Sequence, residues 1–116
     1  DGSGAQKAIE TQLALGWDTN LAGIYGRCEG GEVRSRLAKA EDWLTRNPRD
    51  PQLLLTLGRL CVQSQLWGKA ESYLEASLAI EPGWEAHVEL AHLAERINRT
   101  DDANRHYRAA AELSRR

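Results

Sequence analysis

The sequence predicts an all-α protein, a right-handed stack of antiparallel helix pairs with about 2.5–3 copies of the pair. A motif of a leucine and a small residue recurs three times, and a second motif centred on alanine follows each copy. The composition agrees, because 41% of the residues are hydrophobic and 28% are charged with both signs interspersed. Such a balance is typical of a compact helical domain and not of a disordered chain.

The first motif combines a large residue, a small one, a variable one, an apolar one and a core-sized one. Its copies begin at Leu21, Leu57 and Leu90, at offsets of 36 and 33 residues, close to the length of a two-helix unit. A small second residue, such as Gly58, lets two helices approach near the lower end of the usual packing distance of about 8–10 Å. We therefore expect each copy to mark the first helix of a pair.

The second motif lies a turn later and marks the second helix of each pair. Its copies are 39–44, 69–74 and 102–107, and the first two share Lys-Ala-Glu-x-aromatic-Leu. Together the motifs predict one domain, since a single core suits a chain of 116 residues. We expect a tag or linker remnant at 1–4, a domain at 5–116, a leading helix at 5–15, and repeats at 17–50, 51–83 and 84–116.

The boundaries between the helices carry their own signals. Asp50 is placed to cap the first helix of the second repeat, with Pro51 at its first position. Pro82 and Gly83 end the second helix of that repeat. The first repeat is irregular, because its two motif positions lie 18 residues apart against 12 in the others, which places six extra residues at 26–31.

Helical spacing also predicts the core. Trp43 and Trp67 lie at helix-pairing positions, and we expect Trp67→Ala to cost about 3–5 kcal/mol. Trp17 and Trp84 begin first helices. The other predicted core residues of the second repeat are Leu54, Leu57, Leu60, Cys61, Tyr73, Leu74, Ser77 and Leu78.

Charge and hydropathy exclude two classes of partner. The formal net charge is −2, which argues against nucleic acid as the main partner. Acidic residues follow the basic cluster of Arg34, Arg36 and Lys39, so we expect a solvated helix face there. The longest purely apolar run is Leu53–Leu55, far below the ~20 residues that cross a bilayer, so no membrane insertion by this chain is expected.

No residue pattern predicts catalysis, a metal or a cofactor, and we expect no enzyme. His87 and His92 are five residues apart, about 140° around a helix, and His106 lies on another helix. Cys61 occupies a core position, whereas Cys28 is expected to be the more exposed and more reactive thiol.

A stack of this kind presents a concave wall built from the first helix of each pair, which predicts a groove for a protein or peptide partner. Arginines on this wall would suit an acidic peptide, extended or helical. The predicted groove residues are Thr19, Gly23, Arg27, Leu55, Arg59, Val62, Gln63, Val88, His92, Glu95 and Arg96.

Residues 51–83 resemble a tetratricopeptide repeat, because Leu57, Gly58, Cys61, Ala70, Leu74, Ser77 and Pro82 stand where that repeat carries Leu-Gly, an aromatic, Ala, an aromatic, Ala and Pro. Residues 84–116 resemble a second repeat without its final proline. More narrowly, the strings 53–61, 66–70 and 25–27 resemble the C-terminal region of the HemY family, over about residues 13–113.

That family consists of proteobacterial inner-membrane proteins associated with late haem biosynthesis. The resemblance implies an adaptor that gathers haem-biosynthesis enzymes, in a whole protein anchored by a segment outside this chain, with this part soluble on the cytoplasmic side. A haem or porphyrin carrier, and a structural spacer or self-association module, are the alternatives. We expect a monomer or a weak homodimer formed through an exposed apolar end at Ala8, Ile9 and Leu13.

Overall fold

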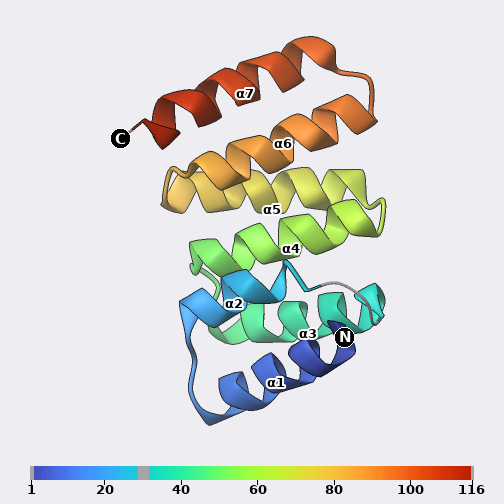
Figure 1. Cartoon of the computed structure of the whole chain (residues 1–116), viewed down its shortest axis with the longest axis vertical. Coiled ribbons are helices and arrows are strands. Elements are labelled where there is room, and N and C mark those ends of the chain that lie inside the picture. The colour runs from blue at the N-terminus through green and yellow to red at the C-terminus, as the bar shows by residue number, and fades with distance from the viewer. Residues whose placement is uncertain (1, 29–31, 116) are drawn as a thin grey trace.

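The protein is all-helical in the computed structural model, which describes residues 2–28 and 32–115 and has no strand among them. The helices follow one another along an axis of 41 Å, against 27 and 25 Å across it (Figure 1). This confirms the all-α prediction. The helices are α1 (Gly2–Leu15), α2 (Thr19–Tyr25), α3 (Val33–Arg46), α4 (Pro51–Gln63), α5 (Trp67–Ile80), α6 (Trp84–Arg96) and α7 (Thr100–Ser114).

One helix and then three helix pairs follow one another along the chain. A leading helix comes first, and the pairs α2/α3, α4/α5 and α6/α7 fall within the three predicted repeats. Two bounds differ. The leading helix already begins at Gly2, inside the stretch predicted to be a tag remnant, and α2 has only 7 residues. Of the six extra residues predicted at 26–31, residues 29–31 lie outside the described part.

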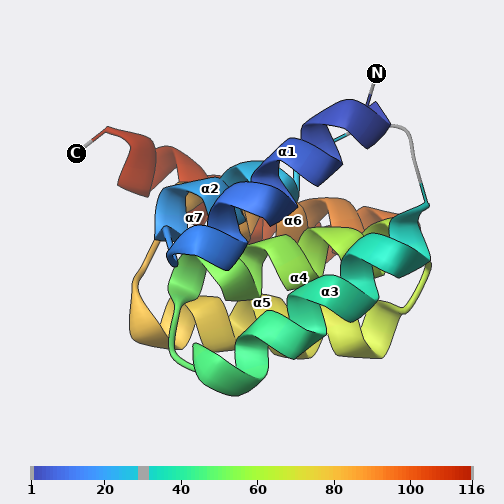
Figure 2. The same cartoon turned by 90° about the horizontal axis from the view of Figure 1, so that it is seen from below.

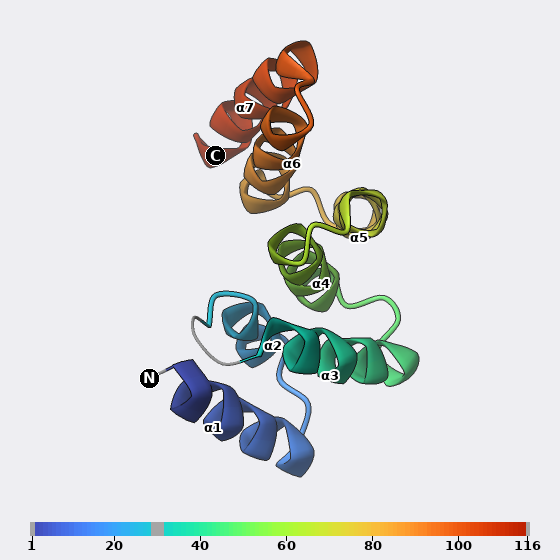
Figure 3. The ribbon, with the colours of Figure 1, turned by 90° about the vertical axis from the view of Figure 1, so that its right-hand side faces the viewer.

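Helix α4 is the centre of the stack, because it contacts α2, α3, α5 and α6. The helix directions turn along the stack: α5 is seen nearly end-on in Figure 3, while α1 and α3 run across the same view. At the N-terminal end, α1 crosses in front of α2 when the stack is seen from below (Figure 2). The pairs are therefore layered and rotated with respect to one another.

The middle pair, α4/α5, is joined by a small residue against a large one, as predicted. A side chain at Gly58 would overlap the buried Leu74 of α5. Leu57 and Leu60 are fully buried beside it, and so is Ala70. The close approach of α4 and α5 therefore depends on the absent side chain of Gly58.

Aromatic rings join the first pair, α2/α3, instead. The rings of Tyr25 and Trp43 lie edge to face with centroids 4.8 Å apart, and Trp17 packs on Trp43 at 5.7 Å. Trp43 is 4% exposed, which confirms it as a core residue. Trp67, at the first position of α5, is only partly buried and packs against the core from its edge, so the prediction of a core residue holds there only in part.

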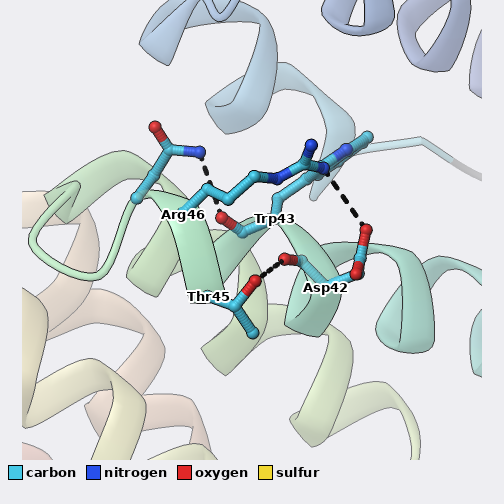
Figure 4. A network of polar contacts seen from close by, with 5 residues as sticks. Asp42, Trp43, Thr45 and Arg46 are labelled. Atoms are coloured by element: carbon cyan, nitrogen blue, oxygen red, sulfur yellow. Dashed lines mark hydrogen bonds and ion pairs between the residues drawn. The ribbon is translucent and has the colours of Figure 1, made fainter.

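The turn between α3 and α4 follows the predicted capping pattern. Asp50 caps α4 by accepting from the backbone N–H groups of Gln52 and Leu53, with Pro51 in the first turn. The preceding end of α3 is tied back on itself: Thr45 Oγ1 donates to the Asp42 carbonyl, and Arg46 lies 3.4 Å from the Asp42 carboxylate (Figure 4). These contacts fix where one pair ends and the next begins.

The apolar end predicted on the leading helix is covered. Ile9 and Leu13 are buried in the common core, because α1 turns them toward the rest of the stack, and only Ala8 of the three is exposed. This corrects the predicted surface for self-association. Among the described residues, no helix has the length and apolar character that a membrane crossing requires.

Candidate functional site

A groove of about 590 Å³ opens where the ends of α2, α3 and α4 meet the middle of α6. Four of the predicted groove residues line it together, namely Arg27, Arg59, Val62 and Gln63. We call it the arginine groove, because three arginines line it. Among the described residues, its lining is Gly26, Arg27, Cys28, Arg36, Arg59, Val62, Gln63 and Glu89.

Arg36 is the residue of this groove that sequence reasoning missed. We expected it on a solvated face, but its side chain is 3% exposed and its Nη2 donates to Gln63 Oε1 at 3.4 Å. The signal was available in the spacing, since Arg36 lies three residues after Val33, four before Ala40 and seven before Trp43. That is the inward face of an amphipathic helix.

Arg59 meets a carboxylate from the next pair. Its Nε donates to Glu89 Oε2 at 3.0 Å, and the two side chains are only 11% and 19% exposed. The ion pair ties α4 to α6 and neutralises part of the charge of the groove. Arg27 on the opposite rim is exposed. Among the described residues, three guanidinium groups and the carboxylate of Glu89 line the groove.

Cys28 lies at the base of the groove and is not the exposed thiol that we expected. It is 9% exposed, because the turn after α2 folds it inward, with its Sγ 3.9 Å from the carbonyl oxygen of Ile24. Burial raises the pKa of the Cys28 thiol, while nearby Arg36 acts in the opposite direction. Burial likewise raises the pKa of Cys61 to about 11, as suits the core position predicted for it.

The predicted residues toward the start of α2 and α4 lie away from the arginine groove. Thr19 Oγ1 donates to Asp50 Oδ1 at 2.6 Å, and Gly23 lies against Gln52. Leu55 is 4% exposed and belongs to the core, which corrects its placement on the binding surface, because α4 is enclosed by its neighbours on several sides.

The predicted residues of α6 form a separate cluster with α7 and α5. His92 packs on Tyr107 with ring centroids 6.1 Å apart, and Glu95 accepts a hydrogen bond from the Tyr107 hydroxyl at 2.8 Å. Arg96 lies over the ring of Trp67 at 5.8 Å. Val88 is partly buried. None of these lines the arginine groove, to which α6 contributes Glu89.

The groove holds the chemistry for binding an anion. Its guanidinium groups donate hydrogen bonds and are charged at any physiological pH. In residues 2–28 and 32–115, no three His, Cys, Asp or Glu side chains gather closely enough to hold a metal ion. Comparisons with family models, with curated proteins and with solved structures gave no match to this chain.

Proposed function

We propose that this chain is a protein-binding scaffold, a right-handed tetratricopeptide-like superhelix whose arginine groove receives acidic side chains of a partner peptide. The observation that carries the proposal is the convergence of the guanidinium groups of Arg27 and Arg59 at one groove, beside the buried side chain of Arg36. The pairs α4/α5 and α6/α7 are of similar length, and each of the three pairs packs on the next, which supports the repeat architecture.

The physical argument rests on where the charge is held. Solvent screens a partly buried ion pair less than an exposed one, so a carboxylate that meets Arg59, whose side chain is 11% exposed, gains more energy than one at an open surface. Guanidinium groups also offer two parallel donors to a carboxylate, which gives direction as well as strength. The volume of about 590 Å³ is within the range of small-ligand pockets, enough for one or two acidic side chains.

The first experiment measures the affinity of a fluorescein-labelled hexaglutamate peptide by fluorescence anisotropy. We expect Arg27→Glu and Arg59→Glu each to weaken binding about tenfold, the effect of losing one charge-assisted contact. Arg34→Glu is the matched control, because Arg34 is exposed on α3 and does not line the groove. If the control variant weakens binding as much as the other two, overall charge and not the groove explains the affinity.

The resemblance to the HemY family supplies a candidate class of partner, the enzymes of late haem biosynthesis, and a membrane-anchored whole protein as the setting. The immobilised chain would be used to capture proteins from a proteobacterial membrane extract, beside the Arg27→Glu, Arg59→Glu double variant. Recovery of those enzymes by the unaltered chain alone would support this assignment. Equal recovery by the unaltered chain and the double variant would show that these enzymes do not bind in the arginine groove.

A further inference from the structure

A second cleft runs along the edge of the stack where the turns between successive pairs lie. The α3–α4 and α5–α6 turns and the end of α7 lie on this side, on the left in Figure 1. Two adjoining cavities of about 500 and 680 Å³ form the cleft, and both are lined by Pro51, Gln52 and Glu81. We call it the edge cleft. Since α4 runs from Pro51 to Gln63, the edge cleft and the arginine groove lie at opposite ends of this helix.

The cavity of about 500 Å³ presents an open aromatic side chain. Trp84, the first residue of α6, lines it and is 45% exposed. Pro51, Pro82 and Leu113 line the same cavity. The face of an indole ring attracts a cation that lies over it, more strongly than the face of a phenyl ring does. The Trp84 end of the cleft therefore offers an apolar platform with a preference for a positively charged group.

The charges beside Trp84 have the same preference. Glu81 and Glu85 line this cavity, and no described lining residue of it is basic. Neither carboxylate forms an ion pair with another described residue. The Glu85 carboxylate turns back toward the start of α6, with its Oε1 3.7 Å from the place that a β-carbon of Gly83 would take. Its charge outweighs the half positive charge of the helix N-terminus, and that of Glu81 is added to it.

The second cavity has a mixed lining. It contains both signs, Arg49 beside Asp50, and the Asp50 carboxylate is already bonded to Trp17 and to the backbone of α4. The preference for a cation is thus confined to the Trp84 end. The remainder of the cleft has the room and the polar groups, such as the Gln52 amide, for the neighbouring residues of a peptide.

We propose that the edge cleft binds a basic peptide segment of a partner protein, with one arginine side chain over the indole ring of Trp84 and within reach of Glu81 and Glu85. A guanidinium group suits both contacts, because it is planar, stacks on aromatic faces and donates paired hydrogen bonds to a carboxylate. This site goes beyond the arginine groove. It gives the chain a second peptide site, selective for the opposite charge, at the other end of α4.

The test is the affinity of a fluorescein-labelled Gly-Arg-Gly-Arg-Gly peptide, measured by fluorescence anisotropy. The same peptide with citrulline in place of arginine is the uncharged reference and should not bind. Trp84→Leu keeps an apolar side chain without the ring and should weaken binding about threefold to tenfold. Glu81→Gln should weaken it about twofold to fivefold. Asp101→Asn is the matched control, because Asp101 is exposed on α7 and does not line the cleft.

A second measurement needs no variant during the titration. The indole N–H groups give separate NMR signals, and the arginine peptide should shift that of Trp84 and leave that of the buried Trp43 unchanged. Equal affinity for the citrulline peptide, or equal weakening in Asp101→Asn and Glu81→Gln, would overturn the proposal. A Trp84 signal that moves with the concentration of the chain alone would also overturn it, because a second copy of the chain would then occupy the cleft.

Discussion

The first and middle helix pairs carry the same repeated motif but are held together by different means. In α4/α5, the missing side chain of Gly58 admits Leu74, and the two backbones approach closely. In α2/α3, the rings of Tyr25 and Trp43 meet between the helices. In the first pair, the small residues beside the motif face another helix, since a side chain at Gly23 of α2 or at Gly26 just after it would meet α4.

The difference teaches that two helix pairs with the same motif can place their small residues against different neighbours. Helix α2 is short and depends on contacts with α4, where buried Thr56 Oγ1 donates to the Ala22 carbonyl at 2.5 Å. The arginine groove lies between these two pairs, and residues of both pairs line it. We call the contact surface between the two helices of a pair its seam.

The largest effect is expected at the aromatic seam of the first pair. Trp43→Ala should lower the free energy of unfolding by about 3–5 kcal/mol, the usual cost of emptying a buried aromatic site. Trp67→Ala should cost clearly less, because Trp67 is only partly buried. Chemical denaturation of both variants measures the difference, and equal costs would contradict the packing described for the first pair.

At the seam of the middle pair, Gly58→Ala should lower the free energy of unfolding by about 1–3 kcal/mol, because the added carbon overlaps Leu74. Gly68→Ala is the matched control within the same pair. It meets no atom within 4 Å, and alanine favours a helix, so this variant should be neutral or stabilising. A Gly58→Ala variant as stable as the control would show that α4 and α5 need no such close approach.

The link between the two pairs should be weaker than either seam. Thr56→Val keeps the shape of the side chain but leaves the Ala22 carbonyl without the hydroxyl donor, at a cost of about 1 kcal/mol. Hydrogen exchange followed by NMR locates the effect. Amides of α2 should exchange faster while those of α5 keep their protection, and uniform acceleration would argue against a local link.

The last pair adds a dependence of stability on pH just below neutrality. Burial lowers the pKa of His87 and His106 below their ordinary value of 6.5, and the carboxylates of Glu71, Glu75 and Asp102 offset only part of this for His106. The folded state then binds fewer protons than the unfolded state, so stability falls as the pH drops below about 6.5. Thermal melting from pH 7.5 to 5 should show this loss in the unaltered chain and a smaller one in His87→Asn.

The sequence predicts the helices of this protein well, because their signals are local. Asp50 and Pro51 mark the start of α4, and the small residue at Gly58 marks a seam. The site was harder to predict. Arg36 resembles a surface residue in composition, and His87 and His106 lie 19 residues apart, so only the packing of the helices shows that they meet.

The groove residues predicted in the third repeat also depend on helix packing, which the sequence does not give. We expected the first helix of each repeat to present the same face, which predicted His92, Glu95 and Arg96 beside Arg59. In the structure, Glu89 is the residue of α6 that contacts Arg59. The rotation between successive pairs decides which face of α6 meets the groove, and the repeat spacing alone does not give that rotation.

The most direct test of the central claim is NMR detection of the Nε–Hε groups of the arginines while unlabelled hexaglutamate peptide is added. Binding in the arginine groove predicts shifts at Arg27, Arg36 and Arg59, with Arg34 unchanged as the internal reference. Shifts that follow surface exposure, large at Arg34 and absent at Arg36, would contradict the assignment of this groove as the binding site.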